Sequence, residues 1–355
     1  MTNFWLGSWV AASMAASVMG CAPPTADAAA SEMSSVAMDP APSTRVGEIE
    51  LGVYAAEVAG ISDTRVDLPR VANADVHRRL REAILTHYGA PLPEANYFSV
   101  RKPGWDADLP LLETWLRMAA VYGTPTLAFE PIVEKPWDVF RDGPEMTALA
   151  EMFKRLGDDG IEVRVRFASE ANLWGSPYSA TRQPGGIDAY KRAARWFRKA
   201  MPGNVKLIFS PLINTPIEGK FEGYDSGLEK MKQMYEKGVY DFIGGTVYSS
   251  ANYTLRQIYD RYVKEMRSLD ATTPLHICEL GGPISQRQEV LGFIRDSASG
   301  RYPGLVRINI FGSRVNGRRE NELGPHGTLM SGSGPSYLRD LFKVSTSASL
   351  PRREG

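Results

Sequence analysis

The feature that most constrains the fold of this chain is a regular alternation of short apolar runs with longer amphipathic segments, which starts near Gly47. The apolar runs are typical of β-strands, and the segments between them have the spacing of amphipathic helices. The strand candidates are 49–56, 95–101, 125–130, 162–169, 205–210, 241–248, 274–279 and 305–311; the helix candidates lie near 74–88, 110–121, 144–156, 186–201, 225–237, 254–268 and 286–296. Eight β-then-α units over about 265 residues predict a (β/α)8 TIM barrel.

An open, doubly wound α/β sheet would show the same alternation. Such sheets usually have fewer strands and carry a glycine-rich phosphate turn after the first strand. Here the first strand candidate runs into residues 55–60, whose sequence AAEVAG lacks that fingerprint. The barrel is therefore the predicted fold, as one domain over residues 46–345.

The N-terminal segment has the composition of an export signal. Residues 1–20 are mostly small and apolar, contain no acidic residue and form too short an apolar run for a membrane span. The run Val18-Met19-Gly20-Cys21 resembles a bacterial lipobox, although residues 2–17 contain no Lys or Arg. We expect a signal peptide over 1–20, lipidation of Cys21, a flexible Ala-, Ser- and Pro-rich linker over 21–45 and a disordered tail over 346–355. The protein would then be an outer-membrane lipoprotein of the cell envelope, or a secreted protein.

Charge and cysteine content exclude several classes of function. Lys plus Arg equals Asp plus Glu at 41 each, so no long-range field attracts nucleic acid or anionic lipid. Two cysteines, at 21 and 278, are too few for a disulfide framework or a structural zinc site, and the four histidines have no metal-binding spacing. We expect a polar, uncharged partner, contact with a membrane only through a lipid anchor, and no metal or organic cofactor.

Three of the predicted strands end in glutamate. Because the active sites of barrels collect at the carboxyl ends of the strands, these positions are the candidates for chemistry. Glu130 ends the strand candidate 125–130, Glu170 follows 162–169, and Glu279 ends 274–279. A charge beside an apolar run is costly unless it is exposed or partnered, so each glutamate could also be only the polar end of a strand.

Strand alternation predicts which side chains accompany these carboxylates. Two sets of residues are expected to share a face: Arg164, Arg166 and Glu170, and Leu275, Ile277 and Glu279. Both carboxylates would then point toward the mouth of the barrel. Arg166 would lie one layer below Glu170, where its charge either fixes the geometry and pKa of a carboxylate or forms a structural ion pair with another strand.

The strand-end motifs resemble those of glycoside hydrolase family 26, the β-mannanase family of the clan A barrels. The stretch VRFASEANLWG at 165–175 resembles the fourth-strand motif of that family. Three further stretches match in order: TLAFEP at 126–131, YDFIG at 240–244 continuing to Tyr248, and PLHICELG at 274–281. The resemblance covers roughly residues 47–330 and implies a (β/α)8 barrel with glycoside hydrolase activity.

The resemblance also implies roles for individual residues. Glu170 would be the general acid/base and Glu279 the nucleophile, with a hydrogen bond from Tyr248 to Glu279. Trp174 would offer a platform for a sugar ring. The family usually has His immediately before the acid/base, whereas this chain has Ser169.

Further candidates for substrate binding are Arg166, Glu130 and Asn172. Asn172 lies in the loop after the fourth strand, and a residue of a packed loop would show the same pattern. The chemistry itself also requires two carboxylates, because cleavage of an acetal needs a proton on the leaving oxygen and an anion or activated water on the other face of the sugar. The predicted function is a monomeric, retaining endo-β-glycosidase. Its polysaccharide substrate stays open among β-mannan, another β-glycan and a bacterial exopolysaccharide.

Two alternatives remain from the sequence. A polysaccharide-binding envelope lipoprotein could have kept the barrel and lost catalysis. A phosphate-handling barrel enzyme would carry glycine-rich loops after its seventh and eighth strands, which Gly281, Gly282 and Gly312 match only faintly.

Overall fold

The computed structural model describes residues 45–54, 72–173, 175–182, 184–213, 227–249, 253–282 and 286–311. Within these ranges one sheet runs in the order β1-β2-β9-β8-β7-β6-β5-β4-β3. All neighbouring pairs are parallel except β1 with β2. The strands are β1 (Arg45–Val46), β2 (Ile49–Tyr54), β3 (Ala95–Val100), β4 (Thr126–Pro131), β5 (Val163–Phe167), β6 (Val205–Phe209), β7 (Phe242–Tyr248), β8 (Leu275–Gly281) and β9 (Leu305–Phe311).

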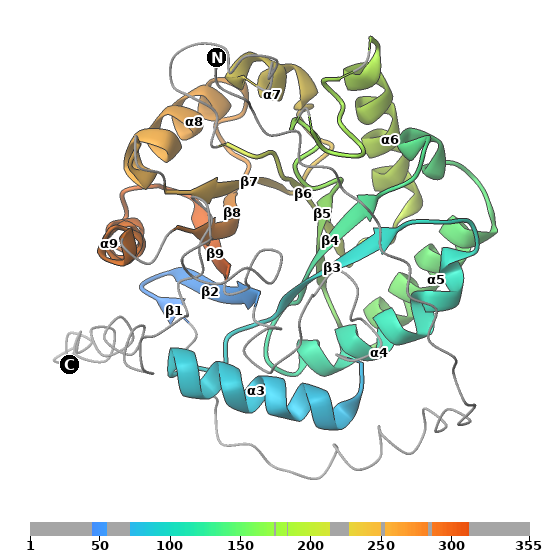
Figure 1. The fold of residues 1–355 in the computed structure, drawn as a ribbon, viewed down its shortest axis with the longest axis horizontal. Coiled ribbons are helices and arrows are strands. Elements are labelled where there is room, and N and C mark those ends of the chain that lie inside the picture. Colours follow the sequence, from blue (N-terminus) through green and yellow to red (C-terminus); the bar gives the residue numbers. More distant parts are fainter. Residues whose placement is uncertain are drawn as a thin grey trace, which may run out of the picture. The chain divides into compact units, whose positions relative to one another are not determined.

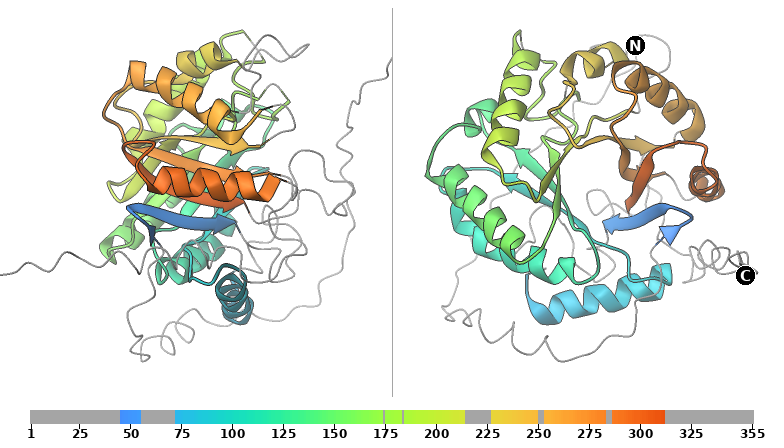
Figure 2. Two further views of the ribbon diagram at one scale, coloured as in Figure 1. Left: turned by 90° about the vertical axis from the view of Figure 1, so that its left-hand side faces the viewer. Right: turned by 180° about the vertical axis from the view of Figure 1, so that it is seen from behind.

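The helices lie outside the curled sheet and connect its parallel strands (Figure 1). They are α3 (Ala74–Tyr88), α4 (Leu109–Ala120), α5 (Pro144–Asp158), α6 (Gly186–Ala200), α7 (Leu228–Met234), α8 (Leu255–Leu269) and α9 (Arg287–Ala298), with short 3₁₀ helices η3 (Trp105–Asp108) and η4 (Pro136–Val139). The view from behind shows the same arrangement of helices around strands (Figure 2). This is an α/β fold built from β-then-α units, as the sequence predicts.

The two edges of the eight parallel strands meet at one point. An isolated parallel bridge joins Val53 of β2 to Glu94, which directly precedes β3. The Val53 N–H donates a hydrogen bond of 2.9 Å to the carbonyl of Pro93. The sheet therefore curls far enough for its first and last parallel strands to touch, and the carboxyl ends of all eight strands face the same side.

The predicted elements agree closely with the observed ones, although α7 is shorter than predicted and one strand at the N-terminus was missed. Strand β1 was not predicted, and Arg45, the last residue of the expected linker, pairs in it with Glu50. The expected signal peptide, the lipidation site Cys21 and the tail 346–355 lie outside the described residues. Trp174 lies outside them as well.

Apolar side chains fill the space between sheet and helices, and a different set lines the inside of the sheet. Val163, Val165 and Phe167 of β5 belong to the outer core, as alternation predicts. The inner cluster is mainly aromatic and consists of Tyr54, Ala95, Tyr97, Ala128, Tyr248 and Phe311. Buried polar residues, including Arg166, also lie on the inner side. The interior of the sheet is therefore a packed, partly polar layer that can hold a site.

Local signals fix the ends of several helices. The side chain of Asn73 caps α3 by accepting hydrogen bonds from the backbone of Asp75 and Val76, and Gly89 ends this helix in the left-handed conformation at φ 75°. A reciprocal capping box of Thr254 and Gln257 starts α8. These ends set the connections that return the chain to the sheet.

Candidate active site

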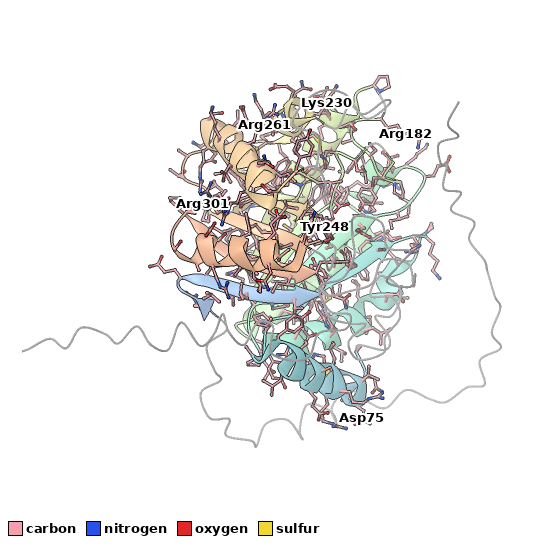
Figure 3. The ribbon with its side chains drawn as sticks, turned by 60° about the vertical axis from the view of Figure 1, so that its left-hand side comes forward. Asp75, Arg182, Lys230, Tyr248, Arg261 and Arg301 are labelled. Carbon is pink, nitrogen blue, oxygen red and sulfur yellow. The ribbon has the colours of Figure 1, made fainter. Side chains whose placement is uncertain are left out.

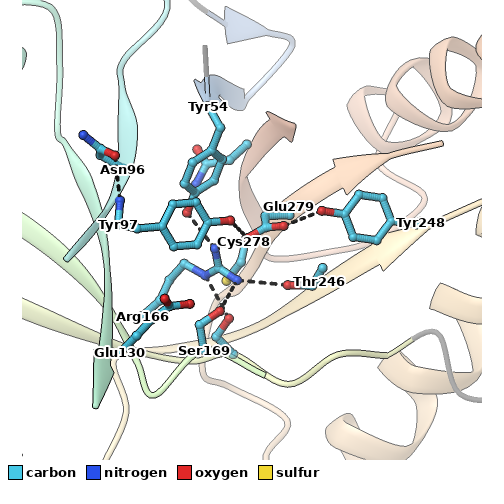
Figure 4. A network of polar contacts seen from close by, with 12 residues as sticks. Tyr54, Asn96, Tyr97, Glu130, Arg166, Ser169, Thr246, Tyr248, Cys278 and Glu279 are labelled. Atoms are coloured by element: carbon cyan, nitrogen blue, oxygen red, sulfur yellow. Dashed lines mark hydrogen bonds and ion pairs between the residues drawn. The ribbon is translucent and has the colours of Figure 1, made fainter. Parts of the chain in front are cut away.

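Glu279 is a buried carboxylate at the carboxyl end of β8, with an exposed fraction of 3%. Three side chains from three other strands donate hydrogen bonds to it (Figure 4). Arg166 of β5 and Tyr97 of β3 donate to Oε1, the latter at 2.5 Å, and Tyr248 of β7 donates to Oε2. A carboxylate with this many donors is a pre-organised anion.

The charge state of Glu279 follows from these partners. Burial alone would raise its pKa, but the Arg166 guanidinium lowers it, with further lowering by the hydrogen bonds from Tyr248 and Tyr97. The net result is a pKa below the ordinary value for glutamate. Glu279 is therefore ionised at neutral pH in spite of its burial.

Arg166 is the centre of the network and is fully buried. Its five N–H donors match five bonds. The acceptors are Ser210 Oγ (3.0 Å), Tyr54 Oη (2.7 Å), Ser169 Oγ (2.6 Å), Thr246 Oγ1 (2.9 Å) and Glu279 Oε1. The sequence left two roles open for Arg166, and the contacts give it both: it forms an ion pair between β5 and β8 and orients a catalytic candidate. Because Arg166 is fully buried, it is a positioning residue for Glu279.

A β-bulge in β8 turns Glu279 toward the inside of the sheet. In the pairing with β7, Ile277 faces Gly245 and Glu279 faces Thr246, so Cys278 is an extra residue on β8. Leu275 and Ile277 consequently pack in the outer core, whereas Glu279 contacts Arg166 inside. The expectation that Leu275, Ile277 and Glu279 share one face was wrong, because strict alternation does not continue through a bulge.

Gly281 gives Tyr248 the room to reach Glu279. A Cβ atom on Gly281 would lie 2.7 Å from the Tyr248 ring, closer than side chains tolerate. The Tyr248 ring packs edge-on against Phe311 at 5.9 Å between centroids. Figure 3 shows Tyr248 among the strands, whereas Asp75 and Arg301 lie at the periphery. The absence of a side chain at Gly281 thus allows the hydrogen bond from Tyr248 to Glu279.

Glu170 lies in a tight turn that directly follows β5. Strand β5 ends at Phe167, earlier than predicted, and both Ala168 (φ 42°) and Glu170 (φ 58°) adopt the left-handed conformation that non-glycine residues rarely take. The Glu170 N–H donates to the carbonyl of Ser210 at 2.8 Å, which fixes the turn against the end of β6. Strain of this kind concentrates at functional sites.

The phenol of Tyr248 experiences the charge of both candidate carboxylates. Burial raises its pKa well above the ordinary value, and the negative charges of Glu279 and Glu170 raise it further. Tyr248 donates directly to Glu279. Glu170 and Glu279 therefore act on the same phenol at the carboxyl side of the sheet.

Glu130 and Asn172 have partners that occupy their polar atoms. The carboxylate of Glu130 accepts hydrogen bonds of 3.0 Å from Ser99 and from Tyr178. The amide of Asn172 is fully buried and forms two hydrogen bonds of 2.8 Å with the backbone of Leu212, one in each direction. Asn172 thus ties the loop after β5 to the loop after β6, which is a positioning role and not exposure to a substrate.

Four residues of the network were missed by sequence reasoning, namely Tyr54, Tyr97, Ser210 and Thr246. Tyr97 and Thr246 lie within predicted strands, and Tyr54 and Ser210 at strand ends, but their residue types give no signal of a role. Ser169, which replaces the family's usual His, is buried and accepts from Arg166. The one signal available was the carboxyl-end position of Tyr54 and Ser210.

The described ranges contain neither a candidate metal site nor a candidate membrane span. Within them, no group of three His, Cys, Asp or Glu side chains is placed to hold a metal ion. None of the helices in these ranges combines the length and apolar character that a membrane span needs.

No family model matches the chain, and no curated protein matches its sequence. Several similar solved structures are β-mannanases. One, from a symbiotic protist of the termite Reticulitermes speratus, has 14% identity over 78% of this chain and 84% of its own, with a TM-score of 0.46. A family 26 β-mannanase from Bacteroides ovatus has 17% identity over 71% and 79%, with a TM-score of 0.43. The family 26 domain of a Prevotella bryantii endo-β-mannanase/endo-β-glucanase has 13% identity over 74% and 83%, with a TM-score of 0.46. Two of these three structures are named as members of family 26, and at such identities and TM-scores the likeness does not establish an activity.

Proposed function

We propose that this chain is a (β/α)8-barrel glycoside hydrolase that cleaves a polysaccharide with retention of configuration. Glu279 is the nucleophile and Glu170 the general acid/base. The observation that carries the proposal is the set of three donors from three strands that keeps the buried Glu279 ionised. Glu279 carries these donors at the carboxyl end of β8, the edge at which the active sites of barrels collect.

In the first step Glu279 attacks the anomeric carbon while Glu170 gives its proton to the departing glycosidic oxygen. The bond from the anomeric carbon to that oxygen breaks, and a covalent glycosyl ester forms on Glu279. The ionised state of Glu279 suits this attack, since burial has already removed most of the water around the carboxylate.

In the second step Glu170, now a carboxylate, takes a proton from water, and the resulting oxygen attacks the anomeric carbon. The ester bond breaks, Glu279 leaves as a carboxylate, and the sugar is released with its original configuration. Arg166 and the two tyrosines receive the returning negative charge. No step needs a redox partner or a metal ion.

The substrate in this proposal is a neutral polysaccharide, either β-mannan, another β-glycan or a bacterial exopolysaccharide. The equal numbers of acidic and basic residues support a neutral polymer. We also propose that the monomeric enzyme is held at the cell envelope through lipidated Cys21 and the linker that follows it. Trp174, which follows the acid/base by four positions, is the candidate platform for one sugar ring.

The test uses glycine variants of both carboxylates and added azide. With an activated substrate, Glu279→Gly should yield an azide product of inverted configuration, because azide enters the space left by the nucleophile. Glu170→Gly should form the glycosyl enzyme, stall, and yield an azide product of retained configuration. Each variant should lose at least about 10² to 10⁴-fold in turnover without azide. A matched control is Glu82→Gly, on an exposed ion pair of α3, which should keep wild-type turnover.

Two results would contradict the proposal. Near-normal turnover of both glycine variants would show that other groups carry the reaction. A separation of the two carboxyl groups close to 10 Å in an experimental structure, against the roughly 5 to 5.5 Å of retaining enzymes, would do the same. Binding of polysaccharide by a wild type that releases no product would instead favour the binding-lipoprotein alternative.

A further inference from the structure

The two carboxylate oxygens of Glu279 accept different numbers of hydrogen bonds. Oε1 accepts from Arg166 Nη1 and from the Tyr97 phenol, whereas among the described residues the donor to Oε2 is the Tyr248 phenol alone. Each carboxylate oxygen offers two lone-pair directions. Oε1 has used both, and Oε2 retains one.

We propose that Tyr97 is a positioning residue which, together with Arg166, occupies Oε1 and so makes Oε2 the atom that attacks the sugar. This inference rests on the proposed function and assigns a role within it that the motifs do not carry. The free lone pair of Oε2 forms the bond to the anomeric carbon, and Oε1 becomes the carbonyl oxygen of the ester. Tyr97 and Arg166 remain bonded to Oε1 as the ester forms.

The Tyr97 phenol is held rigidly enough for this role. Its side chain is buried, and its ring packs on that of Tyr54 at 5.1 Å between centroids. The Arg166 guanidinium lies 5.7 Å from the Tyr54 ring and 6.0 Å from the Tyr97 ring. Two aromatic rings and the guanidinium thus form one block, and a rotation of the Glu279 carboxylate would break two bonds to that block at once.

Hydrogen bonding from Tyr97 also favours the ionised form of the nucleophile. Burial raises the pKa of Glu279, Arg166 lowers it, and the phenols of Tyr248 and Tyr97 lower it further. The titratable or charged groups that face Glu279 come from five strands and one turn: Tyr54, Tyr97, Arg166, Tyr248, Cys278 and, through Tyr248, Glu170. Removal of one donor should leave this set otherwise intact.

The variant Tyr97→Phe tests the inference, because it keeps the ring and removes the donor. The rate of labelling by 2-fluoro-β-mannobiosyl or 2-fluoro-β-cellobiosyl fluoride should fall about ten-fold. The acid limb of the kcat/KM profile on an aryl glycoside should move up by about one pH unit, since Glu279 must be ionised in the free enzyme. If the labelling rate and the pH profile of kcat/KM are both unchanged from the wild type, Tyr97 does not have this role.

Tyr190→Phe is the matched control. Tyr190 is a buried tyrosine of α6 whose hydroxyl accepts one hydrogen bond of 3.0 Å from Tyr240, in the outer core. Loss of the Tyr190 hydroxyl should lower the free energy of unfolding about as much as Tyr97→Phe does. The acid limb of the kcat/KM profile should stay at its wild-type pH. If this variant moved the acid limb as far as Tyr97→Phe does, loss of a buried phenol in general would explain the effect, and the inference would fail.

A crystal structure of the fluorosugar-labelled wild type tests the choice of oxygen even if Tyr97→Phe does not fold. We expect the ester bond on the oxygen that faces Tyr248 in the free enzyme, with Arg166 and Tyr97 still bonded to the other oxygen. A bond to the Arg166-bound oxygen would overturn the inference while leaving the proposed function intact. A wild type that cleaves a polysaccharide but is not labelled on Glu279 by the 2-fluoro glycosyl fluoride of the sugar it cleaves would remove the proposed function itself.

Discussion

At the scale of single residues, the site depends on one arginine whose donors are all used. Arg166 binds four hydroxyl groups and the Glu279 carboxylate from a fully buried position. A buried guanidinium that lost one of these acceptors would keep its desolvation cost without compensation. The network is therefore expected to fail as a unit, and its members should show strongly non-additive effects when they are changed together.

Gly281→Ala should reduce activity through Tyr248. The new Cβ atom would lie 2.7 Å from the tyrosine ring and must displace it, which weakens the hydrogen bond to Glu279. We expect kcat/KM to fall about ten-fold or more, the loss typical of a hydrogen bond to a charged group. Steady-state kinetics of Gly281→Ala, Tyr248→Phe and the double variant measure this effect.

The control for this experiment is Gly203→Ala, where a Cβ atom meets nothing within 4 Å. It should keep wild-type kinetics. On the Tyr248→Phe background the Gly281→Ala change should add little. If the losses in kcat/KM of the two single variants add fully in the double variant, Gly281 does not act through Tyr248.

Trp174→Ala should weaken turnover of polysaccharide by lost stacking on a sugar ring. The expected cost is about 1 to 2 kcal/mol in kcat/KM, by analogy with other aromatic contacts. Kinetics on polysaccharide and on a short aryl glycoside should separate the effect of a distant subsite from a general defect. A variant that does not fold would show instead that Trp174 belongs to the core.

At the scale of secondary-structure elements, the seam between β2 and β3 is reinforced by Glu94. Its backbone takes part in the bridge to Val53. Its buried carboxylate lies 2.9 Å from His77 Nε2 of α3 and accepts hydrogen bonds from Arg81 (3.0 Å) of α3 and Trp115 (3.1 Å) of α4. One residue thus ties the two sheet edges to the helices that cover them. This seam is where the curled sheet depends on side chains and not on a continuous ladder.

Glu94→Gln should reduce stability most at neutral pH. Burial raises the pKa of Glu94, but the bonds and charges of His77 and Arg81 lower it to about 2, below its ordinary value. The stabilisation is therefore fully present above pH 4.5 and is lost as the pH falls toward 2, with a total of about 3 kcal/mol at most. Urea unfolding as a function of pH should show this decline in the wild type and a flatter dependence in the variant.

Glu82→Gln, on an ion pair of α3 whose side chains are more than 60% exposed, serves as the control. Surface pairs of this kind contribute little, so the wild-type pH dependence should persist. If both glutamine variants lose the same stability at neutral pH, the buried network of Glu94 contributes no more to stability than the exposed ion pair of Glu82.

At the scale of the whole molecule, the proposed attachment to an envelope rests on the first 45 residues. We expect radiolabelled fatty acid to enter the wild type and not Cys21→Ser, because the other cysteine, Cys278, is buried inside the sheet. Metabolic labelling in a bacterial host that processes lipoproteins measures this directly. Equal incorporation into both proteins would show that Cys21 is not the modified residue.

The sequence alone specifies the order and type of the elements from β2 to β9. Apolar runs at period two and helical segments at period 3.6 depend on local residue order, so the positions of β5 and α6 were predicted within one or two residues. It also placed Glu170 and Glu279 at the carboxyl ends of strands, because that edge is fixed once the strands are parallel. Strand β1 could not be predicted, because a run of two residues is too short to show a period.

Which side chains contact Glu279 depends on how the strands assemble in the folded protein. Tyr97 and Glu279 are 182 positions apart in the chain, and nothing local to either residue encodes that contact. The bulge at Cys278 has no sequence signature, since it arises from the register of β8 against β7, and it reverses the face that alternation assigns to Glu279. The early end of β5 and the left-handed turn at Glu170 likewise depend on the hydrogen bond to Ser210 across the sheet. Periodicity is a property of neighbours in sequence, whereas register and lone-pair sharing are set by strands that meet only after the sheet has curled.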